Sequence, residues 1–248
     1  MACIITIEGN IGSGKSTLVN NLKENLDSSK YCFIQEPVDI WQTIKDSNGV
    51  DMVSKFYTDQ SKYAFTFQMM AYISRLSILR KNVRENPGKI LISERSLYTD
   101  KHVFCQMLYD QGKMESVEYQ IYNKWFEDFI QDIPKMGIVY LKTDPQIAYD
   151  RVIKRNREGE NIPLEYLLEC SKYHDSWISE DTNLGLSKLV IDGNSNINET
   201  PTIVEGWAKL IEEFAILMKN STSDKSSTTS RKPVDDIPKT DSFGNVYY

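Results

Sequence analysis

The sequence predicts an α/β protein built on a five-stranded parallel sheet with helices on both faces. Two observations carry this prediction. Short runs rich in Ile, Val and Leu alternate with longer segments of helical periodicity, and such alternation is typical of parallel sheets joined by right-handed crossovers. Three of these runs also end in a carboxylate, which places acidic groups at one edge of the expected sheet.

The expected strands and helices follow one another along most of the chain. Strands are expected at residues 3–8, 31–36, 89–94, 137–143 and 188–192. The clearest helical segments cover residues 16–26, 65–83 and 116–133. In a sheet of this kind the binding crevice lies beyond the carboxyl ends of the strands, where Glu8, Glu36 and Glu94 are expected.

Composition narrows the class of protein further. At 248 residues the chain suits one domain, expected over residues 1–220, followed by a polar tail at 221–248 that we expect to be disordered. A net charge of −6 argues against a broad nucleic-acid-binding surface, and no apolar run approaches the length of a membrane span. Four scattered cysteines, and a start that enters a strand at once, favour a reduced cytoplasmic protein without a signal peptide.

Residues 9–16 match the eight-residue phosphate-loop pattern GxxxxGK[ST], between an apolar strand and an amphipathic helix. Glycines let backbone N–H groups turn toward phosphates, and the helix N-terminus adds a positive end. Lys15 is expected on the β- and γ-phosphate oxygens, and the Ser16 hydroxyl is expected on Mg²⁺. The loop predicts a nucleoside triphosphate site made of Gly9, Asn10, Ile11, Gly12, Ser13, Gly14, Lys15, Ser16 and Thr17.

A second basic group lies in the segment "YDRVIKRNREGE". Arg151, Lys154 and Arg155 are three and four residues apart, so on a helix they share one face, and Arg157 follows shortly after. Arginines that close over a phosphate chain stabilise the charge that develops in phosphoryl transfer. We therefore expect Arg151, Arg155 and Arg157 to contact the donor phosphates.

Five motifs in order resemble the deoxyribonucleoside kinase family, and in particular its deoxycytidine and deoxyguanosine kinases. They are "IEGNIGSGKST", "EPV" followed by Trp41, "FTFQ" with "SR" shortly after, "ERSLYTD" and "IPLEYL". The resemblance runs from about residue 3 to about residue 217. It implies the P-loop kinase fold, a homodimer, and the ATP- and Mg²⁺-dependent 5′-phosphorylation of a deoxyribonucleoside in nucleotide salvage.

The resemblance also implies roles for the reacting groups. Glu36 corresponds to the carboxylate that contacts the nucleoside 5′-hydroxyl, where it can accept the proton as the oxygen attacks phosphorus. Arg95 would hold Glu36 and the transferring phosphoryl group in register. Glu94 would help to hold Mg²⁺ together with Ser16. With Lys15, Glu36 and Arg95 form the expected catalytic set.

Recognition of the base is expected from three polar residues. Gln68 offers both a donor and an acceptor, and it lies seven residues from Arg75, on the same face of a helix. In the family, an arginine paired with an aspartate accompanies deoxycytidine and purine deoxynucleosides, whereas thymidine-preferring members lack that combination. Because the chain has Arg75 and Asp100, we expect deoxyguanosine, deoxyadenosine or deoxycytidine to be favoured over thymidine.

The sugar and the walls of the site complete the expected acceptor pocket. Tyr57 and Glu160 match the positions that hold the sugar 3′-hydroxyl, and Glu158 remains a rival for Glu160 because the segment before "IPLEY" is one residue shorter than in deoxycytidine kinase. Apolar and aromatic side chains are expected around the sugar and base. They are Ile11, Trp41, Val53, Phe67 and Phe104.

Two other functions are open from the sequence. A nucleoside-monophosphate kinase of the thymidylate type shares the fold and the loop, but it would need an arginine where Glu36 stands, because a carboxylate repels a phosphomonoester. A noncatalytic nucleotide-binding subunit would be expected to lack Lys15, Glu36 or Arg95. The long helices around residues 60–84 and 114–133 carry apolar residues on more than one face, which favours a dimer.

Overall fold

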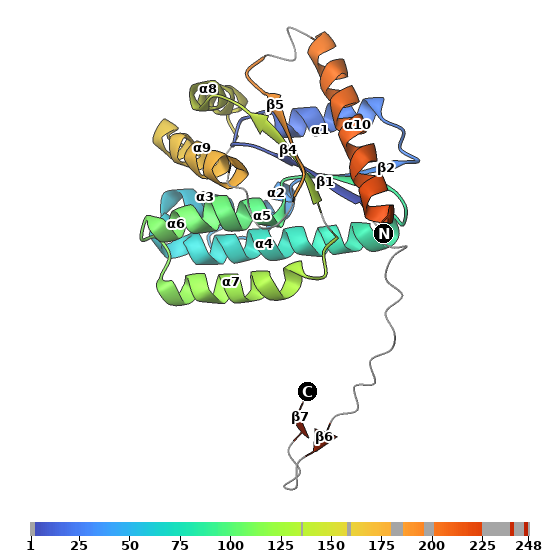
Figure 1. The fold of residues 1–248 in the computed structure, drawn as a ribbon. Coiled ribbons are helices and arrows are strands. Elements are labelled where there is room, and N and C mark those ends of the chain that lie inside the picture. The colour runs from blue at the N-terminus through green and yellow to red at the C-terminus, as the bar shows by residue number, and fades with distance from the viewer. Residues whose placement is uncertain are drawn as a thin grey trace.

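The computed structural model describes residues 3–134, 136–157, 160–179, 186–195, 201–224, 239–240 and 246–247. Its centre is a parallel five-stranded sheet in the order β2-β3-β1-β4-β5 (Figure 1). The strands are β1 (Cys3–Glu8), β2 (Tyr31–Ile34), β3 (Ile90–Glu94), β4 (Met136–Lys142) and β5 (Lys188–Asp192). The predicted fold class is confirmed, and β1 lies between β3 and β4.

The central position of β1 follows from its composition. All six of its residues are buried, because helices cover both faces of the sheet and leave no polar side to the strand. Ile5 aligns with Ile92 on one side and with Gly137 on the other. A side chain at Gly137 would collide with Phe214 and Ile5, so the glycine lets the last long helix pack closely on the strands.

Two layers of helices enclose the sheet (Figure 1). α1 (Lys15–Asn25) and α10 (Pro201–Asp224) cover one face, where they bury the Ile5 and Ile7 side chains. α4 (Gln60–Glu85), α7 (Ser116–Ile130) and α9 (Leu164–Ser179) lie on the opposite side. The three helical segments expected from periodicity correspond to α1, α4 and α7.

Shorter helices connect these layers at the carboxyl edge of the sheet. They are α2 (Val38–Thr43), α3 (Met52–Thr58), α5 (Leu97–Thr99), the π-helical η1 (Asp100–Cys105), α6 (Gln106–Asp110) and α8 (Pro145–Arg155). Asp144 caps α8 by accepting a hydrogen bond from the Gln146 N–H, and Pro145 occupies the first turn, where no donor is lost. This cap orients α8 so that its basic face lies beside the phosphate loop.

One expected strand boundary is corrected by the structure. β2 ends at Ile34, so Glu36 lies in the loop after the strand and not within it, because the following Pro37 favours an extended residue that leaves the ladder. α10 continues to Asp224, past the expected domain limit at residue 220. Beyond it, β6 (Lys239–Thr240) pairs with β7 (Val246–Tyr247), and the other tail residues lie outside the described part of the chain.

Candidate functional site

A cleft of about 880 Å³ opens at the carboxyl edge of the sheet. It brings together every predicted site residue except Gly9 and Asn10. The predicted residues that line it are Ile11, Gly12, Ser13, Gly14, Lys15, Ser16, Thr17, Glu36, Trp41, Val53, Tyr57, Phe67, Gln68, Arg75, Glu94, Arg95, Asp100, Phe104, Arg151, Arg155, Arg157 and Glu160. Residues from positions 11 to 160 therefore converge on one cavity.

The phosphate loop has the backbone geometry that a cradle of N–H groups requires. Gly12 has φ +78°, and a Cβ there would lie 2.2 Å from the Ala148 carbonyl oxygen, so α8 could not approach as it does. Gly14, at φ +98°, is the residue immediately before α1. Its left-handed conformation turns the chain into the helix, whose free N–H groups then face the cleft.

Lys15 is buried, and its Nζ donates a hydrogen bond of 2.7 Å to the Asn10 carbonyl oxygen. Burial, together with the nearby positive charge of Arg95, lowers the pKa of Lys15 to about 7. Because the positive charge of Lys15 is costly in the free protein, a bound polyanion would stabilise the charged form strongly. The loop is therefore prepared electrostatically for phosphate oxygens.

Asn10 and Arg151 brace the loop in ways that the sequence did not predict. The Asn10 side chain does not line the cleft and donates to the Leu167 carbonyl oxygen at 2.8 Å, which ties the loop to α9. The Arg151 guanidinium donates to the carbonyl oxygens of Ser13 and Gly193, at 3.2 Å and 2.9 Å, and also to those of Asn194 and Ser195. A phosphate contact by Arg151 stays a prediction, since its N–H groups are used here to join the loop to the end of β5.

Ser16 and Glu94 meet across the cleft, as a shared metal site requires. The Ser16 hydroxyl donates to a Glu94 carboxylate oxygen at 2.7 Å. Hydroxyl and carboxylate oxygens fit Mg²⁺, which commonly keeps several waters and takes its remaining ligands from substrate phosphates. Among the described residues no group of three or more His, Cys, Asp or Glu side chains could hold a metal alone, so this pair can supply only part of such a shell.

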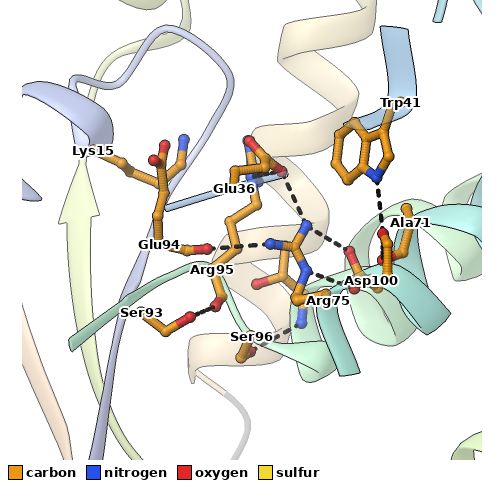
Figure 2. A network of polar contacts seen from close by, with 12 residues as sticks. Lys15, Glu36, Trp41, Ala71, Arg75, Ser93, Glu94, Arg95, Ser96 and Asp100 are labelled. Carbon is orange, nitrogen blue, oxygen red and sulfur yellow. Dashed lines mark hydrogen bonds and ion pairs between the residues drawn. The ribbon is translucent and has the colours of Figure 1, made fainter. Parts of the chain in front are cut away.

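A buried network of ion pairs extends through the cleft from Glu36 to Asp100 (Figure 2). Glu36 lies 3.0 Å from Arg75 Nη2 and 3.3 Å from Arg95 Nε. Although burial opposes its charge, Arg95 and Arg75 lower the pKa of Glu36 to about 2. Glu36 is therefore ionised at neutral pH and is a weak base in the free protein.

Arg75 carries the network onward to Asp100. Its Nε and Nη2 donate to the two Asp100 oxygens at 2.9 Å and 3.3 Å, and its Nη1 donates to the Glu94 carbonyl at 3.1 Å (Figure 2). Both residues are almost fully buried. Gln68 lies beside them in the cleft, and its buried Oε1 has no hydrogen-bond partner. That acceptor is available to a donor group on a ligand.

Arg95 adopts a strained backbone conformation at the end of β3. Its φ of 64° belongs to the left-handed region that bulky residues rarely occupy. The strain is held by three contacts: Arg95 N–H to Ile7 O at 3.0 Å, Arg95 Nη1 to Gly9 O at 3.2 Å, and the Ser93 hydroxyl to Arg95 O at 3.1 Å. The turn directs the guanidinium into the cleft, where it lies 4.9 Å from the centre of the Phe104 ring.

Aromatic rings form one wall of the cleft, on the side where the sequence predicts the nucleobase. Trp41 meets Phe67 edge to face at 5.6 Å, and Phe67 stacks on Phe56 at 4.4 Å. The Trp41 Nε1 donates to the Ser74 hydroxyl at 2.8 Å, which fixes the indole plane. Phe104 lines the same cavity next to Arg95. Aromatic side chains that line a cavity suit a planar ring as ligand.

The two residues predicted to contact the sugar 3′-hydroxyl lie close to the basic side chains in and after α8. Glu160 is ion-paired with Arg155 and with Arg157, the latter at 2.8 Å. Burial, and then the charge of Glu160, raise the pKa of Tyr57 well above its usual value, so the phenol remains neutral. Glu158, the rival for Glu160, lies outside the described residues.

Part of the cleft was missed by sequence reasoning. Gly193, Asn194 and Ser195, which follow β5, line the cleft and accept hydrogen bonds from Arg151 with their carbonyl oxygens, and Trp207 lines the cleft as well. The signal was available in the polar stretch after the fifth strand, since that position is also a carboxyl end. Tyr166 also lines the cleft, and its ring meets that of Tyr57 at 6.3 Å.

Comparison with known proteins places this geometry in a family. A family model described as deoxynucleoside kinase matches residues 5–215. The chain is 37% identical to a probable deoxycytidine kinase of Fowlpox virus (strain NVSL), over 77% of this chain and 78% of that protein. It is 33% identical to the deoxycytidine kinase of Homo sapiens, over 72% of this chain and 76% of that protein. It is also 33% identical to "Thymidine kinase 2, mitochondrial" of Homo sapiens, over 82% and 75% of the two chains.

Proposed function

The chain belongs to the deoxynucleoside kinase family, a family of phosphotransferases, and on that premise we propose that it transfers the terminal phosphoryl group of ATP to the 5′-hydroxyl of a deoxyribonucleoside in nucleotide salvage. The observation that carries the proposal is the common cleft of Lys15, Glu36 and Arg95. A donor cradle and an acceptor carboxylate face the same cavity, which is what direct transfer between two bound substrates requires.

The proposed reaction follows from the position of each group. The triphosphate lies along residues 9–17, with Lys15 on its terminal oxygens. Ser16 and Glu94 would hold Mg²⁺, which would supply positive charge to the phosphate oxygens. Glu36 accepts the hydrogen bond of the 5′-hydroxyl, directs its oxygen at the γ-phosphorus, and takes the proton as the new P–O bond forms and the bond to ADP breaks. Since its pKa is about 2, orientation contributes more than basicity.

We propose that the base is a cytosine or a purine in preference to thymine. Both deoxycytidine and thymidine kinases are among the relatives, so the family alone leaves the base open. The bidentate pair of Arg75 with Asp100 favours an exocyclic amine or ring nitrogen, and Gln68 offers a free acceptor beside it. The 5-methyl group of thymine would have to pack against this buried charged pair.

The 3′-hydroxyl of the sugar is assigned to Tyr57 and Glu160, and the planar base to the space between Phe67, Trp41 and Phe104. Val53 and Ile11 complete the apolar lining. A carboxylate at Glu36 also disfavours an acceptor that already carries a phosphate, because the two negative charges would meet in a buried site. This argues against a nucleoside-monophosphate kinase.

We propose that a second copy of the chain covers the exposed face of α7 and α4. Val117, Ile121 and Trp125 are 56%, 40% and 45% exposed and recur every four residues along α7, and Ile73 of α4 is 49% exposed. Such a stripe suits a symmetric pairing of helices.

No described helix is both long and apolar enough to cross a membrane. The four cysteines are free thiols, which suits the reducing cytosol that we propose as the compartment.

The reaction is tested by identifying the phosphorylated product. The protein is incubated with γ-labelled ATP and Mg²⁺ and, in separate reactions, with each deoxyribonucleoside or its 5′-monophosphate. We expect label in deoxyribonucleoside 5′-monophosphates and none in diphosphates. Label only in diphosphates, or hydrolysis of ATP without transfer, would overturn the proposal.

A further inference from the structure

We propose that Glu160 couples the two halves of the cleft, so that the sugar 3′-hydroxyl of the acceptor strengthens the hold of Arg155 and Arg157 on the donor phosphates. The inference rests on the proposed function and adds to it a thermodynamic link between the two substrates. It starts from one observation: the residue assigned to the sugar is bonded to the arginines assigned to the phosphates.

The contacts on the donor side use both oxygens of the carboxylate. Arg155 Nη2 donates to Glu160 Oε2, and Arg157 Nη1 donates to Glu160 Oε1 at 2.8 Å. The Glu160 side chain is only 8% exposed, whereas the two arginine side chains are 35% and 34% exposed. The buried carboxylate therefore holds both arginines, and their other guanidinium N–H groups lie on the cleft.

The acceptor side is reached through Tyr57. Burial is the main cause of the raised pKa of Tyr57, and the charges of Glu160 and, more weakly, of Glu36 add to it. All three side chains line the same cavity. Glu160 therefore shares a cavity with the acceptor carboxylate Glu36 while it is ion-paired with the two arginines.

The hydrogen-bonding capacity of these groups sets the sign of the coupling. Each carboxylate oxygen can accept two hydrogen bonds, and Glu160 uses one on each oxygen for an arginine, which leaves room for a hydroxyl donor. Each guanidinium has five N–H groups and spends one on Glu160, which leaves others for phosphate oxygens. A sugar hydroxyl and a phosphate chain can thus be bound at the same time, and each orders the same carboxylate–arginine unit.

Charge distinguishes this coupling from a merely structural role. Glu160 with Arg155 and Arg157 carries a net charge of about +1, and the variant Glu160→Gln would carry about +2. Donor binding in the absence of nucleoside should therefore not weaken in Glu160→Gln. If Glu160 only supported the fold of the segment, donor binding would weaken under every condition.

The test measures the Kd of a non-hydrolysable ATP analogue with Mg²⁺ by isothermal titration calorimetry. The full chain is titrated alone, with a saturating 2′-deoxyribonucleoside, and with the saturating 2′,3′-dideoxy form of the same nucleoside. We expect the first nucleoside to tighten analogue binding about fivefold or more and the second to change it less than about twofold. By reciprocity the analogue should tighten binding of the first nucleoside by the same factor.

Glu160→Gln should abolish the difference between the two nucleosides, while the matched variant Glu165→Gln, at an exposed position on α9, should preserve it. Equal tightening by both nucleosides on the unaltered protein, or no tightening, would overturn the inference even if the variant folded poorly. A difference that persisted in Glu160→Gln would also overturn it. These results are separable from failure of the proposed function, in which no deoxyribonucleoside would be phosphorylated at all.

Discussion

Arg75 lies 3.0 Å from Glu36 and forms a bidentate pair with Asp100, so the residue assigned to base selection also holds the carboxylate assigned to the reacting hydroxyl. With Arg95, these groups form a set of two cations and two anions. Base recognition and orientation of the 5′-hydroxyl are therefore parts of one charge-balanced unit. Changes at Arg75 should consequently appear in kcat as well as in KM.

Charge balance predicts how single and double variants differ in stability. Arg75→Met leaves Asp100 buried without its partner and should lower the free energy of unfolding by about 3–5 kcal/mol. Asp100→Ala leaves an unpaired part of Arg75 and should also destabilise the protein. The double variant restores balance and should be more stable than either single variant, as measured by urea unfolding. Additive losses would show that the pair is not energetically coupled.

Glu36→Gln should separate binding from catalysis. Removing the carboxylate removes the acceptor that directs the 5′-hydroxyl, so kcat should fall about 10²–10⁴-fold. The phosphate loop is unchanged, so the Kd of a non-hydrolysable ATP analogue should stay within about threefold. Steady-state kinetics and calorimetry measure the two effects, with Glu24→Gln on exposed α1 surface as the control. An unchanged kcat would remove Glu36 from the mechanism.

The lowered pKa of Lys15 predicts that the protein takes up a proton when the phosphate donor binds. Burial lowers its pKa to about 7 in the free protein, and phosphate oxygens should raise that pKa in the complex. At pH 8 the free protein has largely lost this proton and the complex regains it, so donor binding should weaken as pH rises above about 7. Calorimetric titrations of the analogue in two buffers of different ionisation enthalpy measure the uptake. Lys15→Met should abolish it, and equal heats in both buffers for the unaltered protein would contradict the assignment.

The apolar stripe on α7 predicts a change of assembly. Trp125→Glu places a charge within the proposed helix pairing and should convert a dimer into a monomer in sedimentation velocity. Leu168→Glu, on exposed α9 surface, introduces the same charge away from the stripe and serves as the control. A monomeric unaltered protein, or a dimer that survives Trp125→Glu, would show that a second copy does not use this face.

The five strands and many of the residues that line the cleft were predictable, because they depend on signals local to the chain. Apolar runs located the five strands, and the motifs located residues such as Glu94 and Arg75 that the fold brings together. The left-handed conformation of Arg95 was not predictable, since nothing in its local sequence demands positive φ and two of the three contacts that hold it come from the distant residues Ile7 and Gly9.

Hydrogen-bond partners that lie far apart in the chain also could not be predicted from the sequence. Asn10 was assigned with the phosphate loop, but its side chain bonds to Leu167, more than 150 residues away. The phosphate contact of Arg151 stays a prediction, and its hydrogen bonds to backbone carbonyls after β5 were not foreseen. Each result depends on which distant backbone groups remain unpaired after folding, and residue spacing carries no information about that.

The central claim is that a charge-balanced pocket at Arg75 and Asp100 selects the base of a deoxyribonucleoside for 5′-phosphorylation. The most direct measurement is kcat/KM for the four deoxyribonucleosides with ATP and Mg²⁺, for the unaltered protein and for the combined variant Arg75→Met, Asp100→Ala. We expect deoxyguanosine, deoxyadenosine or deoxycytidine to exceed thymidine by about tenfold or more, and the variant to shift the ratio toward thymidine. Preference for thymidine in the unaltered protein, or an unchanged ratio in the variant, would contradict the account.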